Sequence, residues 1–349
     1  MNNNLINSNA TLLEALGKLN TLPGKAMTLF VVDENGRAIG SLTDGDIRRS
    51  LLRGISLESR VTEAARSPFK ALSNDSDDVT LLRHCRLAGI NLVPRLDDEG
   101  RIVEIIDLNT TRTRLPLRAI LMAGGKGERL RPMTLSTPKP LLEIEGKAII
   151  DYNIEALASV GINDITVTTR YLAEQIEQHF ANPVAGVSVK CVKEDIPLGT
   201  IGAAALANIP EQGCTLIMNS DLLTTISFEE LYLKHRESNA EATIAVIPYQ
   251  VSVPYAILTL DGDNVSGIAE KPAYSYYANA GIYIFNNKWL RSLPLDRRTD
   301  ATDLLDEIIS QGKRVAYYPI KGTWIDVGSP VDFRQAGELM RHHRNLSEN

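Results

Sequence analysis

The alternation of short apolar strands with helices after residue 118 restricts the possible folds of this chain more than any other feature. Strands are predicted at residues 119–123, 165–169, 187–192, 215–219, 256–260, 280–285 and 315–319, and helices at residues 149–160, 172–180, 201–207, 300–311 and 330–343. Alternation of this kind favours parallel strands joined by right-handed crossovers. Ligands of such sheets bind beyond the carboxyl ends of the strands. The sequence therefore predicts an α/β domain over residues 116–349, with a ligand site at that edge of its sheet.

The first third of the chain contains a weak internal repeat. Residues 28–46 and residues 92–110 each hold an apolar run, an acidic turn ending in Gly-Arg and a second apolar run. Such turns between apolar runs are typical of β-hairpins. Flanking helices are expected at residues 12–19, 47–52 and 79–88. The repeat predicts two similar α+β modules within residues 1–115, about 1–62 and 63–115, followed by a polar, basic linker at residues 109–117.

Composition excludes several classes of function. The 349 residues carry a formal net charge of −6 and no run of Lys and Arg, which argues against nucleic acid as a partner. No apolar stretch approaches the roughly 18 residues that a membrane span needs, and the N-terminus lacks the features of a secretory signal. The three cysteines, Cys85, Cys191 and Cys214, fit neither a disulfide framework nor a zinc site. We expect a cytoplasmic protein without a membrane partner.

The strongest motif lies in residues 120–142, ILMAGGKGERLRPMTLSTPKPLL. An apolar strand runs directly into Ala123, Gly124, Gly125 and Gly127, and glycines at this spacing let backbone N–H groups approach a phosphate. Arg129 follows with a fixed positive charge, which a polyphosphate leaving group needs. The segment is neither a Walker A loop nor a dinucleotide-binding G-x-G-x-x-G.

This segment resembles the signature of the sugar nucleotidyltransferases, G-G-x-G-x-R-L-x-P followed by P-K-P, and matches it at every fixed position. The resemblance covers roughly residues 117–339. It implies a Rossmann-like α/β fold with a mixed sheet, an NTP and a sugar-1-phosphate as substrates, and pyrophosphate as by-product. It also implies catalytic roles at the phosphates for Arg129, Lys139 and Lys271.

Further segments match the family in the expected order. The loop that contains Glu194, Leu198, Gly199 and Thr200 resembles the segment that reads the nucleotide base. The resemblance assigns Mg²⁺ to Asp221 and Asp326, and the sugar and its phosphate to Glu270, Lys271, Asn279 and Gly281. Both aspartates end predicted strands, so the same sheet edge is expected to bring them together, and Mg²⁺ favours a few carboxylates with water and phosphate oxygens.

The mechanism that the resemblance implies requires no protein nucleophile. An oxygen of the sugar-1-phosphate attacks the α-phosphorus of the NTP in line, so the enzyme must position two polyanions and neutralise their charge. Arg129, Mg²⁺ and the glycine-loop amides suit the triphosphate. Lys139 and Lys271 suit the phosphates from the other side.

The N-terminal repeat resembles a pair of CBS domains. Residues 40–46, GSLTDGD, fit the family pattern in which a threonine contacts phosphate and an aspartate holds ribose hydroxyls, here Thr43 and Asp46. In the second module the equivalent positions are Asp107 and Thr110, so the pattern is broken. We expect at most one regulatory nucleotide site per pair. The alternative is a structural or dimerising pair that binds nothing.

The sequence does not decide which base the NTP carries or which sugar-1-phosphate is the acceptor. The Pro-Leu-Gly-Thr-x-Gly-Ala loop is most similar to that of guanylyltransferases, and a CBS pair ahead of the catalytic domain resembles the glucosamine-1-phosphate guanylyltransferases of nonulosonate (legionaminic acid-type) pathways. Mannose-1-phosphate, heptose-1-phosphate, UTP and dTTP are the alternatives. A non-catalytic CBS sensor is an alternative of another class, but it predicts eroded catalytic positions. We also expect a homo-oligomer.

Overall fold

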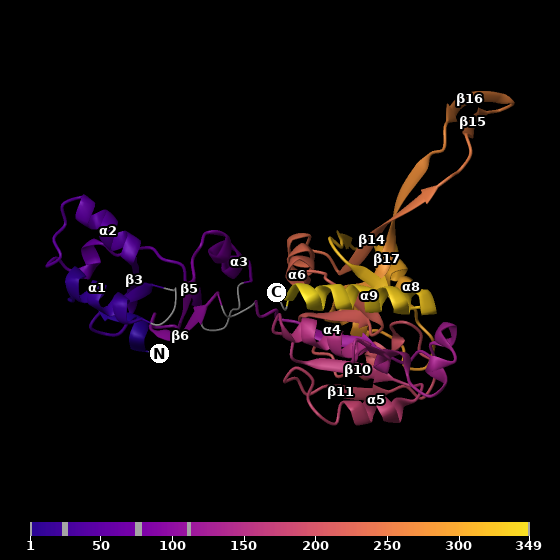
Figure 1. Ribbon diagram of the computed structural model, residues 1–349, viewed down its shortest axis with the longest axis horizontal. Coiled ribbons are helices and arrows are strands. Elements are labelled where there is room, and N and C mark those ends of the chain that lie inside the picture. The colour runs from indigo at the N-terminus through magenta and orange to yellow at the C-terminus, as the bar shows by residue number, and fades with distance from the viewer. Residues whose placement is uncertain (1, 23–26, 74–78, 110–112, 348–349) are drawn as a thin grey trace. The chain divides into compact units, whose positions relative to one another are not determined.

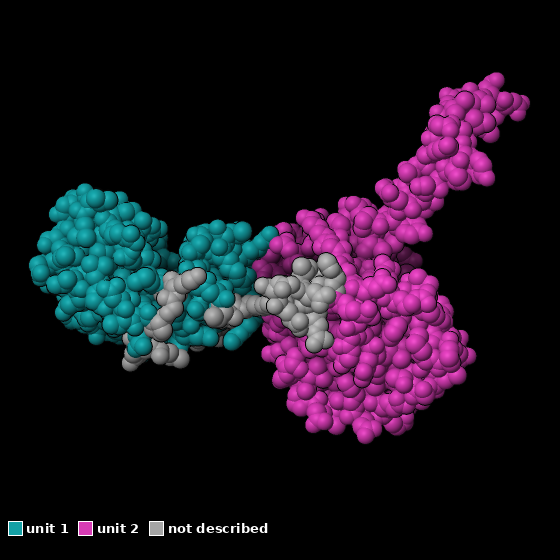
Figure 2. Space-filling model, in the orientation of Figure 1, with its two compact units in different colours: residues 1–114 teal, residues 115–349 magenta. Residues whose placement is uncertain are grey.

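The computed structural model describes residues 2–22, 27–73, 79–109 and 113–347. The chain divides into two compact units, residues 1–114 and residues 115–349, which are coloured separately in Figure 2. The division falls inside the polar segment 109–117. None of the helices in the described ranges is long and apolar enough to cross a lipid bilayer.

The first half of unit 1 is a three-stranded sheet with two helices. Its elements are β1 (Leu5–Asn7), α1 (Leu12–Thr21), β2 (Thr28–Val32), β3 (Ala38–Thr43) and α2 (Asp44–Leu52). β1 lies parallel to β2, and β2 pairs with β3 in an antiparallel hairpin. Both helices begin at capping boxes, built by Thr11 with Glu14 and by Thr43 with Asp46. Apolar side chains of both helices and of the strands form one buried cluster.

The second half of unit 1 repeats this sheet arrangement. Its elements are β4 (Leu72–Ser73), α3 (Val79–Leu87), β5 (Leu92–Leu96) and β6 (Ile102–Asp107). β4 lies parallel to β5, and β5 pairs antiparallel with β6. A separate core forms around Leu72, Leu82, Val93 and Ile106. The sequence repeat thus corresponds to two α+β modules of the same strand topology.

Seven strands make the central sheet of unit 2, in the spatial order β11-β10-β7-β12-β17-β14-β18. Their bounds are β7 (Arg118–Met122), β10 (Ile165–Thr169), β11 (Lys190–Lys193), β12 (Cys214–Asn219), β14 (Ala242–Ser252), β17 (Ala273–Asn286) and β18 (Val315–Pro319). β11, β10, β7 and β12 are parallel neighbours, and β17 is antiparallel to both β12 and β14. The predicted α/β fold with a mixed sheet is confirmed.

Helices and short strands cover this sheet (Figure 1). They are α4 (Ile149–Ala158), α5 (Ala173–His179), α6 (Phe228–Glu237), α7 (Asn287–Arg291), α8 (Ala301–Ser310), α9 (Pro330–Ser347), β8 (Glu143–Ile144) paired with β9 (Lys147–Ala148), and β13 (Leu222–Thr224) paired with β19 (Trp324–Asp326). One apolar cluster joins β12 and β17 to α7 and α8, and another joins α4, β13, β19 and α9. The β13–β19 pair matters most for function, because its register places Asp326 opposite Leu222, next to Asp221.

Two sequence expectations need correction. Residues 201–207 were expected as a helix, but the structure has only the short 3₁₀ helix η6 (Gly202–Leu206), and the N–H groups of Ile201 and Gly202 at its start donate to Thr299 O. The strand expected at 187–192 begins later, at Lys190, because Val187 instead closes a tight turn with Val184.

A strand was expected at residues 256–260, but not the two-stranded extension of unit 2 that contains it. β14 and β17 continue as a ribbon beyond the sheet, and the hairpin of β15 (Ile257–Asp261) and β16 (Asn264–Ala269) follows at its end. We call residues 248–277 the arm. Figure 1 shows the arm projecting away from the body of unit 2, and none of its residues is buried.

Candidate active site

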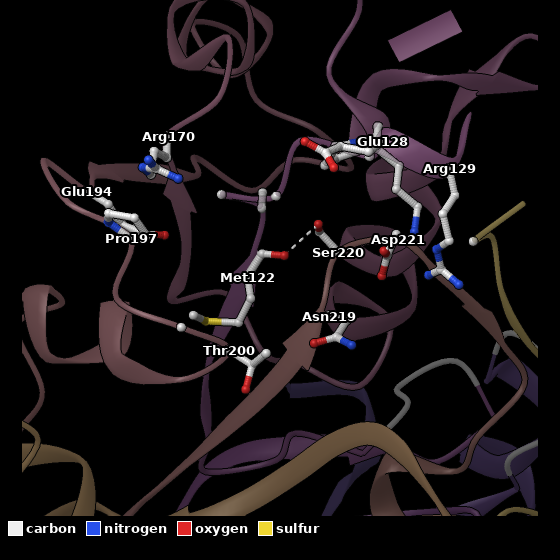
Figure 3. A pocket seen from close by; sticks show the side chains of 18 residues that line it. Met122, Glu128, Arg129, Arg170, Glu194, Pro197, Thr200, Asn219, Ser220 and Asp221 are labelled. Atoms are coloured by element: carbon white, nitrogen blue, oxygen red, sulfur yellow. Dashed lines mark hydrogen bonds and ion pairs between the residues drawn. The ribbon is translucent and has the colours of Figure 1, made fainter. Parts of the chain in front are cut away.

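A cavity of about 530 Å³ opens at the carboxyl ends of the parallel strands β7 and β12 (Figure 3). This is the position at which ligands bind in sheets of this class. Residues from six segments line it: Met122, Ala123, Gly124, Gly125, Gly127, Glu128, Arg129, Lys139, Pro140, Arg170, Glu194, Pro197, Gly199, Thr200, Asn219, Ser220, Asp221 and Gly328. Most residues that the sequence assigned to the NTP therefore line one cavity.

The glycine loop forms one wall, directly after β7. Gly127 has a φ of +60°, and a Cβ there would lie 2.9 Å from Thr134 Cγ2. A Cβ on Gly124 would lie 2.4 Å from Glu194 Oε1. Side chains are therefore excluded at both positions, which leaves backbone groups facing the cavity.

Lys139 links the two predicted metal ligands. Its ammonium forms an ion pair with Asp221 Oδ2 and lies 3.4 Å from Asp326 Oδ1. Lys139 is only 8% exposed, and a charge buried this deeply needs such partners. Asp221 follows β12 and Asp326 ends β19, so the two carboxylates come together through the β13–β19 pair and not through a shared edge of the central sheet.

The two aspartates form a site suited to a cation. Burial raises the pKa of Asp326, the nearby Asp221 carboxylate raises it further, and Lys139 opposes both effects. Asp221 Oδ1 is buried and accepts no hydrogen bond from any described residue. Within the described ranges no three His, Cys, Asp or Glu side chains gather as a metal site. The fit is therefore to a hard cation such as Mg²⁺ that takes few protein carboxylates and obtains its other ligands from water and phosphate.

Arg129 lines the cavity, and its charge acts to lower the pKa of Asp326. It makes no hydrogen bond or ion pair with another described residue. Its guanidinium lies against Gly328, where a Cβ would come within 2.9 Å of Nη2. Figure 3 shows Arg129 and Asp221 on the same side of the cavity. The guanidinium is thus available to an anionic ligand.

The loop that is predicted to read the base forms the wall of the cavity opposite Arg129 and Asp221 (Figure 3). Glu194 is 6% exposed, burial raises the pKa of its carboxyl, and its Oε2 accepts the Leu198 N–H at 3.2 Å. Gly199 has a φ of +89°. Thr200 N donates to Asp300 Oδ1 and Thr200 Oγ1 accepts the Ala301 N–H, both at 2.9 Å, which ties the loop to the start of α8. Leu198 is buried and does not line the cavity.

Arg170 is a cavity residue that sequence reasoning missed. It follows β10 directly and lines the wall near Glu194 (Figure 3). Its charge opposes the effect of burial on the pKa of Glu194. Its position at the carboxyl end of a predicted parallel strand was a usable signal. Asn219, the last residue of β12, and Ser220, which follows it, carry the same signal.

The four residues assigned to the sugar and its phosphate do not line this cavity. Gly281 packs against Asn219, where a Cβ would lie 2.6 Å from Nδ2. The Asn279 side chain donates to Tyr283 OH at 2.7 Å and accepts the Gly281 N–H at 3.0 Å. Glu270 and Lys271 are exposed on the arm. Glu270 and Lys271 lie beyond the end of the β14–β17 ladder at Ser252↔Ala273, and the assignment of all four residues to the sugar and its phosphate stays a prediction.

A second cavity, of about 550 Å³, lies within unit 1. Thr43 and Asp46 line it, together with Phe30, Phe69 and Lys70. Thr43 and Asp46 already form the capping box of α2, and the Asp46 carboxylate also pairs with Arg49 and Arg66. Burial by itself would raise the pKa of Asp46, but these hydrogen bonds outweigh it and lower the pKa. The equivalent position Thr110 lies outside the described residues.

Comparisons with known proteins agree with this architecture. A family model described as nucleotidyl transferase matches residues 118–342, and one described as CBS domain matches residues 4–53. Similar proteins include the mannose-1-phosphate guanylyltransferase catalytic subunits beta of Danio rerio, 30% identical over 226 residues, and of Drosophila melanogaster, 33% identical over 224 residues. These alignments cover 62% of this chain and 62% and 60% of the relatives, so the chain spans less than two thirds of their length.

Among solved structures, HddC from Yersinia pseudotuberculosis is 25% identical, with a TM-score of 0.50. The similarity covers 64% of this chain and 99% of HddC, which has also been solved in complex with GMP-PN. The family model spans more than half of the chain, from the strand before the glycine loop into α9. This chain therefore belongs to the nucleotidyl transferase family, and a CBS domain precedes its catalytic fold.

Proposed function

We propose that this chain transfers a nucleotidyl group from an NTP to a sugar-1-phosphate and releases pyrophosphate. One observation carries the proposal: a loop with three glycines, an arginine without a hydrogen bond to another described residue and a lysine held by two carboxylates converge on one cavity. Family membership supports the same reaction class.

The reaction requires the protein to position the two substrates and to neutralise their charge, but it requires no nucleophile from the protein. An oxygen of the sugar-1-phosphate forms a bond to the α-phosphorus, and the bond between the α-phosphorus and its bridging oxygen to the β-phosphate breaks. The hydroxyl of Ser220, the residue before Asp221, donates to Met122 O at 2.7 Å, so it serves to hold β12 against β7. Arg129 suits the pyrophosphate that leaves, because a guanidinium binds two phosphate oxygens at once.

Asp221 and Asp326 would hold a divalent cation. When bound there, the ion neutralises charge on the phosphate oxygens. With the carboxylates so engaged, the Lys139 ammonium becomes available to a phosphate. The buried, unpartnered Asp221 Oδ1 supports this assignment more than the sequence motif does, because it is an acceptor without a donor.

Within this reaction class we assign GTP as the nucleotide and a hexose- or hexosamine-1-phosphate as acceptor, for example glucosamine-1-phosphate giving GDP-glucosamine. The names of the relatives, mannose-1-phosphate guanylyltransferases, support guanine and make mannose-1-phosphate the first alternative acceptor. UTP or dTTP with another sugar-1-phosphate is the second. The loop from Glu194 to Thr200 would contact the base, because Glu194, Pro197, Gly199 and Thr200 line the same cavity as the glycine loop.

A pyrophosphate-release screen tests the proposal. The purified chain is assayed with Mg²⁺, each of GTP, ATP, UTP, CTP and dTTP, and glucosamine-, mannose- and glucose-1-phosphate. The proposal expects release only when both substrates are present, with the largest kcat/KM for GTP. A preference for UTP or dTTP would refute the base assignment and leave the reaction class intact, whereas no release with any pair would contradict the reaction class.

A second function, nucleotide sensing by unit 1, is supported by its own cavity. Phe30 and Phe69 offer aromatic surface there, and Lys70 offers a cation. Calorimetry on the full chain with AMP, ATP and GTP tests it, with Lys70→Met as the variant and Arg53→Met, outside the cavity, as its matched control. Weakened binding by Lys70→Met alone supports a regulatory site. If both variants bind the nucleotides as tightly as the wild type does, the nucleotides do not bind in the cavity of unit 1. That result favours a pair of modules with a structural role. Binding without any transferase activity would favour the non-catalytic sensor.

A further inference from the structure

A second charged side chain lies near Glu194 in the wall of the active-site cavity. Arg170 follows β10, whose five residues are all buried, so the end of a well-packed strand fixes where its backbone lies. A Cβ on Gly124 would lie 3.5 Å from Arg170 Cβ and 2.4 Å from Glu194 Oε1. The glycine loop, the end of β10 and the loop that begins at Glu194 therefore meet at one place in this wall.

Arg170 and Glu194 are neighbours that do not pair with each other. The charge of Arg170 acts to lower the pKa of Glu194, against the effect of burial, yet no ion pair joins the two side chains. Arg170 makes no hydrogen bond or ion pair with any other residue that the structure describes. Glu194 is 6% exposed, and its Oε2 accepts the Leu198 N–H. The wall thus offers a ligand both a planar fork of N–H donors and a carboxylate.

This donor and this acceptor lie away from the groups that suit phosphate. Figure 3 shows Arg170 and Glu194 on one side of the cavity and Arg129 and Asp221 on the other. Lys139 pairs with Asp221 and so belongs to the second side. A nucleoside triphosphate carries its base at one end and its phosphates at the other. With the phosphates at Arg129 and Lys139, the base would lie at Arg170 and Glu194.

The chemistry of the bases decides which of them fits a guanidinium next to a carboxylate. Guanine carries two adjacent acceptors, O6 and N7, which an arginine fork contacts together. Its N1–H and 2-amino group, on the neighbouring edge, are donors that suit a carboxylate. Adenine carries an amino donor in place of O6 and an acceptor at N1, so it would set donor against donor and acceptor against acceptor. Pyrimidines lack N7.

We propose that Arg170 selects guanine by donating two hydrogen bonds, to O6 and N7 of the base. Glu194 accepts from the N1–H and the 2-amino group. The inference rests on the proposed transferase function and on its assignment of GTP. It adds to that function a specificity-determining residue outside the loop from Glu194 to Thr200, supplied by the end of β10.

Nucleotide analogues test the contact atom by atom. In 7-deaza-GTP a C–H replaces N7, and ITP lacks the 2-amino group. The full chain, Arg170→Met and Arg314→Met are assayed for pyrophosphate release with GTP, both analogues and ATP. Arg314 is the matched control, because it is exposed and does not line the cavity.

The wild type should lose about tenfold in kcat/KM when 7-deaza-GTP replaces GTP. Arg170→Met should lose about 10- to 100-fold with GTP and should then use GTP and 7-deaza-GTP equally well. ITP should weaken the wild type and Arg170→Met by the same factor, because Glu194 is intact in both. The preference for GTP over ATP should fall in Arg170→Met and stay unchanged in Arg314→Met.

Two results would overturn the role of Arg170. One is an unchanged kcat/KM for GTP in Arg170→Met. The other is an equal loss with GTP, 7-deaza-GTP and ATP, which would mean that Arg170 contacts the phosphates or only supports the wall. A wild type that prefers UTP or dTTP would overturn the assignment of GTP and this inference together.

Calorimetry without the sugar phosphate separates this inference from the transferase function. The dissociation constants of GTP and 7-deaza-GTP are compared between the wild type and Arg170→Met. The two chains differ only at Arg170, so a site in unit 1 contributes equally to both titrations. Selective binding of GTP that Arg170→Met abolishes, in a wild type that forms no product, would support the role of Arg170 and refute the transferase function alone. Pyrophosphate release by a wild type whose selectivity survives in Arg170→Met would refute this inference alone.

Discussion

At the scale of single residues, the site depends on a buried lysine shared by two aspartates. Lys139 satisfies one oxygen of Asp221 and leaves the other without a donor. Loss of one partner from such a group leaves uncompensated charge or an unmet acceptor. The same three side chains therefore support both the local structure and the proposed binding of a cation.

Replacing the carboxylates separates these roles. Asp221→Asn and Asp326→Asn keep the side-chain size and remove the charge that a divalent cation requires. We expect each variant to fold and to lose at least about 100-fold in kcat, because charge neutralisation at the phosphates is lost. The assay is pyrophosphate release over a range of Mg²⁺ concentrations.

Asp164→Asn is the control, since Asp164 pairs with Arg118 and Lys190 away from the cavity. Near wild-type turnover in both folded site variants would remove the metal assignment. A similar loss in the control would instead point to a general effect of losing an ion-paired carboxylate.

Arg129 tests the role of shape against that of charge. Arg129→Lys keeps the positive charge and loses the planar fork, so we expect kcat to fall about 10- to 100-fold with little change in stability. Arg131→Lys is the matched control, because Arg131 is half-exposed and pairs with Glu128. Full kcat in Arg129→Lys would mean that a point charge is sufficient there.

The free energy of unfolding of unit 2 is expected to depend on pH through the carboxyl group of Glu241. Burial by itself would raise the pKa of Glu241, but hydrogen bonds from Lys288, Asn286 and Trp289 outweigh it and lower the pKa to about 2. A lowered folded-state pKa means that the stabilisation is complete above the ordinary value of 4.5 and is lost as the pH falls from there towards 2. Glu241→Gln should therefore destabilise unit 2 by about 2 kcal/mol at pH 7.

The measurement is urea unfolding of the variant and the wild type at several pH values between 7 and 3, read on unit 2. The difference between them should shrink as the pH falls below about 4.5. The exposed Glu211, changed to Gln, is the control and should leave the curve in place. A difference that is constant over this range would contradict the role of the Glu241 charge.

Which residues line the cavity was easier to predict than which of them contact one another. The sequence analysis expected the glycine loop directly after one strand and Asp221 at the end of another, and in the structure both line one cavity together with Arg129 and Lys139. It did not predict that Lys139 bridges Asp221 and Asp326, because that contact depends on the pairing of β13 with β19, two three-residue strands without a periodic signal. Arg170 was missed because a single cation after a strand has no motif around it.

At the scale of elements, the loop that is proposed to read the base depends on α8. Gly199 combines a φ of +89° with a Cβ direction that would meet Thr299 O at 2.4 Å. We expect Gly199→Ala to displace the loop and to raise KM for the NTP about tenfold or more, through loss of positioning. KM and kcat are measured separately with the NTP as the varied substrate.

Gly186→Ala is a matched control for this change. Gly186 also has a left-handed backbone, with a φ of +77°, but a Cβ there would meet nothing within 4 Å. The control shares the backbone cost of about 1 kcal/mol and lacks the clash. Equal KM values in the two variants would mean that the loop position does not depend on this contact.

Element prediction succeeded where periodicity was strong and failed where it was interrupted. β7, β10, β12 and α4 lie within a few residues of their expected positions. β14 was missed because Pro248 interrupts its apolar run, and proline argues against an interior strand. In the structure Pro248 lies where β14 leaves the sheet as part of the two-stranded arm, so its missing N–H does not break the central sheet.

At the scale of the whole molecule, the chain joins two units that each hold a cavity, and a nucleotide is the proposed ligand of both. The repeat in the sequence predicted the modular unit 1, and the strand alternation predicted the sheet of unit 2. The arm could not be predicted in the same way, because its exposed apolar faces have the pattern of a strand that packs on a core. Only the absence of a covering surface within unit 2 distinguishes it from such a strand.

The central claim is that the chain moves a nucleotidyl group between two substrates, and transfer of label tests it most directly. The full chain is incubated with Mg²⁺, a hexosamine- or mannose-1-phosphate, and GTP labelled with ³²P at either the α- or the γ-phosphate. The account predicts that the α-label enters a GDP-sugar and that the γ-label leaves in pyrophosphate, with neither product formed when the sugar phosphate is omitted. Release of the γ-label as inorganic phosphate, or no sugar-dependent product with any NTP, would contradict it.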